Sequence, residues 1–272
     1  MGKNKFLSKL YLIIIFIFLY APILTLMVLS FNEGRSMGKW TGFSLHWYLE
    51  MFQDEDIMNA LFNTVVIAVI SSISATIIGT AICIALPHMN KKVSQVLLGL
   101  NNIPLLNADI VTGLSLMLMF VAFGITLSMG TVILAHITFC IPYVILSVRP
   151  RVKQLGISTY EAAIDLGATP AQAIFKVVIP ELRSGIEAGL LMAFTMSIDD
   201  FIVTHFTRGA GVNTLSTLIY GQVKVGIRPT IYALSTVVFV LVFIALLIKN
   251  ILTDNKKDHY KTGTVASTEK KE

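Results

Sequence analysis

Cysteine and charged residues are scarce in this chain. Only two of its 272 residues are cysteines, Cys83 and Cys140, and they lie in separate apolar segments. A disulfide framework or a cysteine-rich metal cluster is therefore not indicated, and both thiols are expected to be buried as small apolar groups. Charged residues make up 14% of the chain, against about 25% in ordinary soluble domains. This shortage of charge argues against a soluble globular protein.

A phosphate-binding loop is also missing. No stretch has the form G-x-x-x-x-G-K-S/T, in which backbone amides and a lysine hold nucleotide phosphates. The chain therefore cannot hydrolyse ATP by that route, and no bound cofactor is expected. No histidine has a companion at ligand spacing, so no metal site is predicted. If the protein is a pump, another chain must supply its motor.

Long apolar segments are what the chain does contain, since hydrophobic residues make up 55% of it. The segment 10–29 has no charged residue and, at about 1.5 Å per residue, is long enough to cross a hydrocarbon core of about 30 Å. It lacks a small-x-small cleavage site at its end, which predicts an uncleaved helix rather than a secretory signal. Six spans are predicted, at residues 10–29, 63–86, 93–123, 131–148, 188–207 and 231–248.

The predicted fold class is therefore an all-α integral membrane protein. Residues 1–253 would form one transmembrane domain, and the polar tail over 254–272 is expected to be disordered. Lysine and arginine gather in the segments that are cytoplasmic if the N-terminus lies inside the cell. The positive-inside rule then predicts cytoplasmic termini and a cytoplasmic segment 158–180. The net charge of +5 fits this topology and lipid contacts, so no nucleic-acid partner is predicted.

The first half of segment 158–180 predicts a short helix with a fixed end. Ser158 and Glu161 form a capping box, in which each side chain satisfies a free backbone N–H at a helix start. The helix is expected to begin near Thr159. Gly167 would take the left-handed conformation, which carries no steric cost for glycine, and would end the helix at Leu166.

The second half of the segment predicts a second helix after this glycine elbow. Thr169 would cap it, with Pro170 at its first position and Gln172 completing another capping box. Pro180 is expected to end it, because proline has no backbone N–H. Two short helices joined by a rigid elbow at a membrane surface would form a lever that another protein can push.

The spacing of this segment resembles a family motif. Glu161-Ala162-Ala163, then Gly167, then Val177-Val178-Ile179-Pro180 is similar to the EAA loop of inner-membrane permeases from ATP-binding-cassette (ABC) importers. The family pattern is EAA, three residues, Gly, nine residues and Ile-x-Leu-Pro, and only Val177 and Ile179 depart from it. The resemblance implies the type I ABC importer permease fold, with residues 158–180 as the coupling helix that docks on a cytoplasmic ATPase.

Other stretches resemble the second permease subunits of spermidine/putrescine importers. They are AHITFCIP at 135–142, EAAIDLGA at 161–168, FTMSIDD at 194–200 and VKVGIRP at 223–229. The resemblance implies a bacterial plasma-membrane complex that imports polyamines. Its other members would be a sister permease, two copies of an ATPase that binds ATP and magnesium, and an extracytoplasmic polyamine-binding protein. The chain itself would be a translocation subunit and not an enzyme.

Carboxylates are the ionisable groups within the spans that indicate a substrate pathway. Asp109 follows Pro104 near the middle of the third span, where proline is expected to break or kink the helix, while Asp199 and Asp200 lie near the outer end of the fifth. A charge in the bilayer is costly and usually faces a cavity. Because no lysine or arginine lies inside the spans, a cationic cargo is favoured. Three aromatic residues are candidates for cation–π contacts with it: Phe139, Tyr143 and Phe201.

Structural interpretations of the same polar residues stay open. Asp199 and Asp200 would instead cap a helix or pair with a neighbour such as Arg208. His136 is interpreted as a hydrogen-bonded packing residue, since a lone histidine in an apolar span is more often that than a ligand. If the carboxylates do line a path, replacing Asp109 or Asp200 with asparagine is expected to cut uptake and leave assembly intact.

Small residues on the second span predict close helix packing. Ser71, Ala75 and Gly79 recur at intervals of four and form one smooth stripe. The stripe is expected to contact another helix of this chain or of a partner permease.

Three other functions also remain open. An importer permease for sulfate, molybdate, iron or another solute would share the same loop. A proton-driven secondary transporter predicts uptake that survives ATP depletion. An intramembrane aspartyl protease would need Asp109 and Asp200 to face one another, but the local Tyr-Asp and Gly-x-Gly-Asp sequences are missing.

Overall fold

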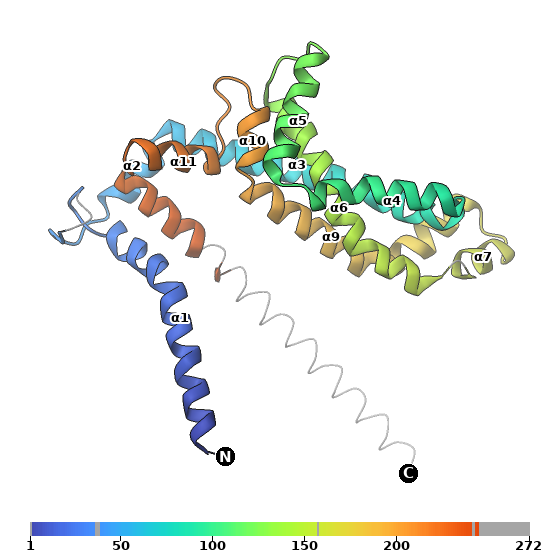
Figure 1. Ribbon diagram of the computed structural model, residues 1–272, viewed down its shortest axis with the longest axis horizontal. Helices are drawn as coiled ribbons and strands as arrows, with labels where there is room; N and C mark the ends of the chain where they lie inside the picture. The colour runs from blue at the N-terminus through green and yellow to red at the C-terminus, as the bar shows by residue number, and fades with distance from the viewer. Residues whose placement is uncertain (1, 36–38, 157, 241–242, 245–272) are drawn as a thin grey trace. The chain divides into compact units, whose positions relative to one another are not determined.

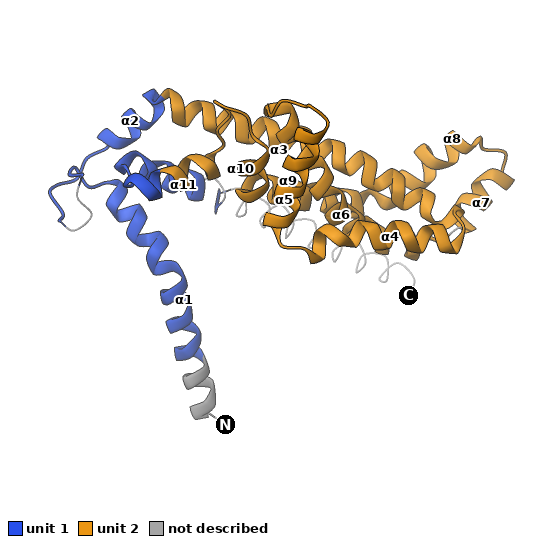
Figure 2. Ribbon diagram, turned by 45° about the horizontal axis from the view of Figure 1, so that its top comes forward, with its two compact units in different colours: residues 1–54, 222–272 blue, residues 55–221 orange. Residues whose placement is uncertain are grey.

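The computed structural model describes residues 2–35, 39–156, 158–240 and 243–244, and within these ranges the elements are helical (Figure 1). A single bridge between Asn32 and Phe43 is the exception. The chain divides into two compact units, residues 1–54 with 222–272 and residues 55–221 (Figure 2). The predicted tail over 254–272 and the last residues of the span predicted at 231–248 lie outside the described ranges.

The first unit begins with a long apolar helix. Helix α1 (Gly2–Ser30) contains the segment predicted as the first span, and its part over Lys9–Ser30 is long and apolar enough to cross a membrane. The short helix α2 (His46–Gln53) is tied to the end of α1, because the hydroxyls of Ser30 and Tyr48 lie 2.7 Å apart. Trp47 also donates its indole N–H to the Asn32 carbonyl at 2.7 Å. A further apolar helix covers Pro229–Val240.

The second unit has a core of three long helices, α3 (Glu55–Ala85), α6 (Met129–Leu155) and α9 (Ile179–Asp199). The predicted stripe of small residues lies in this core. Ser71 donates to the Ile133 carbonyl at 3.3 Å, and Ala75 is fully buried. A Cβ added at Gly79 would lie only 2.8 Å from a methyl carbon of Val144. The stripe therefore packs within this chain, as one of the two expected arrangements.

The segment predicted as the third span is broken. Helix α4 (Lys91–Leu106) and helix α5 (Asp109–Ala122) meet at 111°, so they form either a bent span or a re-entrant loop. The break consists of Asn107 and Ala108, both with an extended backbone, and Pro104, the residue expected to cause it, lies inside α4. Asp109 thus becomes the first residue of a new helix, where a negative charge interacts favourably with the exposed backbone amides.

The segment predicted as the fifth span is also interrupted. Helix α9 begins before the predicted boundary and ends at Asp199, and helix α10 (Ile202–Thr207) follows after two residues. Across the described residues, three helices are long and apolar enough to cross a membrane, or four if α4 and α5 count as one. The protein is thus an all-helical, membrane-type chain, and the six-span count stays a prediction.

The lever predicted at 158–180 contains the expected elbow and second cap. Helix α7 (Ser158–Asp165) is followed by Gly167 with φ of 88°, a conformation that glycine adopts without steric cost. Helix α8 (Pro170–Ala173) has a reciprocal capping box. The Gln172 amide N–H donates to the Thr169 hydroxyl at 3.3 Å, and the Gln172 side chain accepts from the Thr169 amide at 3.1 Å.

The expectation that Pro180 ends this second helix is wrong. The chain continues through a π-helix, η2 (Ile174–Val178), directly into α9, and Pro180 lies in the first turn of α9. The Ile179 amide reaches back five residues to the Ile174 carbonyl. The wider π-turn precedes Pro180 and accommodates this proline, which has no amide hydrogen to donate. The second half of the lever therefore runs into the core helix α9 without a loop between them.

Candidate functional site

The break between α9 and α10 is held by the side chain of Asp200. Its carboxylate accepts the backbone amides of Val203 at 3.2 Å and Thr204 at 2.7 Å, and the Thr204 hydroxyl at 2.9 Å. These amides belong to the first turn of α10, which has no intrahelical partner for them. Asp200 thus stabilises the start of α10 in the way that an aspartate at a helix start commonly does.

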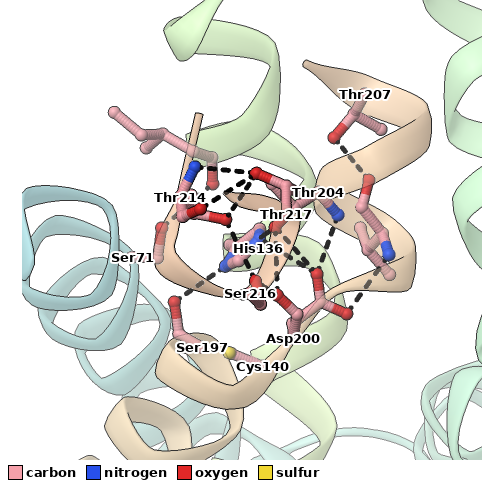
Figure 3. Close-up of polar contacts among 12 residues, drawn as sticks. Ser71, His136, Cys140, Ser197, Asp200, Thr204, Thr207, Thr214, Ser216 and Thr217 are labelled. Carbon is pink, nitrogen blue, oxygen red and sulfur yellow. Dashed lines mark hydrogen bonds and ion pairs between the residues drawn. The ribbon is translucent and has the colours of Figure 1, made fainter. Parts of the chain in front are cut away.

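His136 on α6 completes a buried polar network with this carboxylate (Figure 3). Its Nδ1 lies 2.7 Å from the Ser197 hydroxyl, and its Nε2 lies 2.9 Å from the Thr204 hydroxyl and 3.4 Å from Asp200. The side chains of His136 and Asp200 are 1% and 8% exposed. Because the Thr204 hydroxyl donates to Asp200, a neutral His136 ring carries its proton on Nε2 and accepts from Ser197.

The backbone of Asp200 also takes part in the network. Its carbonyl accepts a hydrogen bond from the Ser216 hydroxyl at 2.7 Å, at the start of helix α11 (Leu215–Val225). The Leu215 amide donates to the Thr64 hydroxyl of α3 at 2.8 Å. Residues from α3, α6, α9, α10 and α11 are thereby joined around the break. The arrangement positions these helices and leaves the Asp200 carboxylate fully engaged with protein groups.

The structure therefore favours the structural interpretation of Asp200, with a partner other than the one named from the sequence. Arg208 donates to the Val212 carbonyl and to the Asn213 side chain instead. The observed partner, His136, is the predicted hydrogen-bonded packing residue. Its contact with Asp200 was not predicted.

The other two carboxylates are exposed in the isolated chain. Asp199 is the last residue of α9, and Asp109 is the first residue of α5. Asp109 and Asp199 are therefore the two predicted pathway carboxylates that are exposed.

The predicted aromatic residues have different environments. Phe139 is 8% exposed and presents its ring to that of His136 at 5.1 Å between centroids, so it belongs to the buried core. Tyr143 is partly buried beside the same core. The Phe201 ring lies 4.3 Å from the Tyr220 ring and 5.3 Å from the His205 ring. Tyr143 and Phe201 are the two that retain accessible surface.

The lever has a buried side and an exposed side. The buried side contains Ala163, Ala173 and Val178. The exposed side contains the other residues predicted to form the coupling loop: Ser158, Glu161, Ala162, Gly167 and Pro180. Leu166 is 90% and Phe175 is 69% exposed. Apolar side chains left open on a helical surface mark a surface that contacts another protein or lipid.

One aromatic contact connects the lever to the end of the core helix α3. The ring of Tyr160 on α7 lies edge-on to that of His88, with centroids 5.2 Å apart. His88 belongs to the short helix η1 (Leu86–His88), which follows α3.

No group of three or more potential metal ligands occurs among the described residues.

Comparisons with known proteins point in one direction. The family described as "Binding-protein-dependent transport system inner membrane component" matches residues 77–257. The chain is 37% identical over 230 residues to the putrescine transport system permease protein PotI of Escherichia coli K12, covering 82% of each chain. It is 34% identical over 254 residues to the spermidine/putrescine transport system permease protein PotC of Haemophilus influenzae, covering 93% of this chain and 98% of that one.

A solved structure supports the fold. The chain is similar, with a TM-score of 0.65 and 13% identity, to a chain of a bacterial ABC transporter involved in the import of the acidic polysaccharide alginate. The match covers 93% of this chain and 98% of the other. At this identity, the likeness concerns the fold alone.

Proposed function

Since the chain belongs to the family of binding-protein-dependent transport system inner membrane components, we propose that it is a permease subunit that translocates polyamines into the cytoplasm. The observation that carries this proposal is its similarity, over most of its length, to permeases of putrescine and spermidine/putrescine systems. Membership of the family makes the chain a transport subunit and not an enzyme. ATP hydrolysis belongs to a separate subunit, which also binds magnesium.

The proposed complex contains a sister permease, two copies of a cytoplasmic ATPase and an extracytoplasmic polyamine-binding protein. This chain would cross the bacterial plasma membrane six times, with both termini in the cytoplasm. The concentration of lysine and arginine on one side supports this orientation. The same orientation brings Glu161 and Ala162 of α7, and Leu166 just after it, to the side where an ATPase could bind them.

The lever would pass motion of the ATPase into the membrane through one continuous stretch of chain. Closure of the ATPase dimer on ATP pushes α7, and η2 carries the displacement into α9 without an intervening loop. At its far end, α9 meets the network around Asp200. A shift of α9 then moves α10 and α11 together, which changes access to a pathway between the two permeases.

The cation pathway would use the exposed carboxylates Asp109 and Asp199, with Tyr143 and Phe201 as aromatic neighbours. Polyamines carry several positive charges, so carboxylates and ring faces suit them. Asp200 and Phe139 would act indirectly, by holding the helices around the path. This division rests on the exposure of Asp109 and Asp199 and on the saturation of Asp200.

Uptake of labelled spermidine and putrescine tests the function. Cells lacking this chain are compared before and after the intact copy is restored, with the partner subunits shown to be present. Restored uptake that stops on ATP depletion is the expected result. Uptake that survives ATP depletion but collapses with the proton gradient would indicate a secondary transporter. Unrestored uptake would move the cargo to another solute of the same importer class.

A further inference from the structure

Two cavities of the second unit share two cations at the end of α6. A cavity of about 430 Å³ lies among the ends of α3 and α6 and the starts of α4 and α7. A second cavity, of about 230 Å³, runs between α4 and α6. Arg149 and Lys153 line both cavities. We call this region the Arg149 site; α4 and α6 lie side by side (Figure 2).

The two cations lack an anionic partner in the part of the chain that the structure describes. The ion pairs found there involve Arg183 and Arg228 among the arginines, and neither Arg149 nor Lys153. Arg149 and Lys153 are one helical turn apart on α6, so their like charges repel. A bound anion between them would remove this repulsion. A guanidinium is well suited to a phosphate, because its N–H groups match the oxygen geometry.

The surroundings of the cations are apolar in one direction. Leu98 and Leu105 of α4 and Ile145 and Leu146 of α6 line the cavity between the helices. None of the 16 residues of α4, all of them described, is buried, so this helix covers α6 loosely. In the topology proposed above, the span 131–148 ends just before Arg149, which would place the cations at the depth of the cytoplasmic lipid headgroups.

We propose that the Arg149 site binds an acidic phospholipid of the cytoplasmic leaflet. Its phosphate would lie between Arg149 and Lys153, within reach of Asn101 and Asn102, which also line the smaller cavity. Its acyl chains would lie along α4 and α6. Basic pockets between membrane helices on the cytoplasmic side suit such headgroups. A soluble phosphate would use the cations and leave the apolar walls uncovered. The site goes beyond the transport function proposed above.

Retention of phosphatidylglycerol by the assembled importer tests the site. The complex is equilibrated with phosphatidylglycerol and phosphatidylcholine, stripped with detergent and weighed by native mass spectrometry. The double variant R149Q/K153Q is expected to retain at least one phosphatidylglycerol fewer per complex than the wild type. The control K91Q/K92Q removes two exposed cations of α4 that line neither cavity and should retain as much as the wild type. Excess inorganic phosphate should displace none of the lipid.

Equal retention by the wild type and R149Q/K153Q overturns the proposal, and so does displacement by inorganic phosphate, which would identify a soluble anion as the ligand. If R149Q/K153Q fails to assemble, photolabelling of the wild-type complex tests the site without a variant. Phosphatidylglycerol with a photoreactive acyl chain should label peptides around Leu98 and Ile145, and the matching phosphatidylcholine should not. Equal labelling by both lipids would overturn the selectivity for an acidic headgroup, and labelling by neither would show that a protein partner covers the Arg149 site.

Discussion

Asp199 and Asp200 are adjacent in the sequence and have opposite surroundings. The Asp200 carboxylate accepts from two backbone amides and a hydroxyl and lies beside His136, whereas Asp199 is exposed at the end of α9. Asp199 is the last residue of α9, whereas Asp200 lies beyond the helix with an extended backbone, so the two side chains leave the chain in different directions. Asp200 thus stabilises the start of α10, and Asp199 is the one that we propose contacts a cation.

Asparagine at position 200 should therefore damage the permease itself. Whichever way the new amide turns, its NH₂ group faces a backbone N–H or the Thr204 hydroxyl that now donates to Asp200. We expect D200N to lower the free energy of unfolding by about 1–3 kcal/mol, and D199N to change it by less than about 0.5 kcal/mol. Thermal unfolding of the purified importer measures both. Equal midpoints for D200N and the wild type would contradict the structural role and return Asp200 to the pathway.

Asp109 should affect the cargo and have only a small effect on stability, because its charge at the start of α5 contributes about 0.3–1 kcal/mol. An exposed charge pair contributes up to about 1 kcal/mol, so D109N is expected to raise the KM of uptake by up to about fivefold. Spermidine, with three amino groups, should be affected more than putrescine, with two. D109E keeps the charge and serves as the matched control. A KM that is unchanged for both polyamines would remove Asp109 from the pathway.

Among the elements, the elbow between α7 and α8 depends on one glycine. Gly167 has φ of 88°, and a Cβ built there would meet nothing within 4 Å, so only backbone strain opposes a side chain. We expect G167A to cost about 1–2 kcal/mol and to weaken the coupling of ATP hydrolysis to uptake. G167N should be milder, because asparagine tolerates this conformation better.

Gly99 in α4 offers the control for this substitution. A Cβ there also meets nothing within 4 Å, and the residue lies in a regular helix. G99A should leave the ratio of ATP hydrolysed to polyamine imported unchanged. If G167A were equally silent, the elbow would not need its left-handed residue.

Core helices approach closely where glycine faces Val144. This side chain lies between Gly79 of α3 and Gly189 of α9, and an added Cβ would come within 2.8 Å and 3.3 Å of its Cγ1, respectively. Overpacking of this kind costs about 1–3 kcal/mol, so G79A should lower the thermal midpoint of the importer. V144A should partly restore it by making room. Additive losses in the double variant would mean that Gly79 acts in another way.

On the scale of the whole molecule, the exposed face of the lever is the surface that we propose binds the ATPase. Leu166 is 90% exposed, so L166S should leave the stability of the permease unchanged. If Leu166 is buried against the ATPase, its loss removes about 1.5–3 kcal/mol of apolar burial and weakens binding about tenfold or more. Co-purification of the ATPase measures the effect. L106S, at another highly exposed leucine, is the control, and equal ATPase recovery from both would exclude Leu166 from the interface.

The sequence by itself determined the features that depend on near neighbours in the chain. The left-handed Gly167, the Thr169–Gln172 capping box and the small-residue stripe were all predicted, and all are present. Each follows from steric or hydrogen-bonding rules that act within one or two turns of helix. The EAA segment indicated the family in the same way, because its spacing reflects the local arrangement of two short helices and a glycine elbow.

Tertiary structure decided what depends on residues far apart in the chain. His136 meets Ser197 and Thr204 across 61 and 68 positions, and no local pattern predicts that contact or the saturation of Asp200. Pro180 was assigned by a local rule to a helix end, yet packing of α9 in the core continues the helix through a wider turn. The sequence specifies which groups need partners, and the arrangement of the helices determines which partners they find.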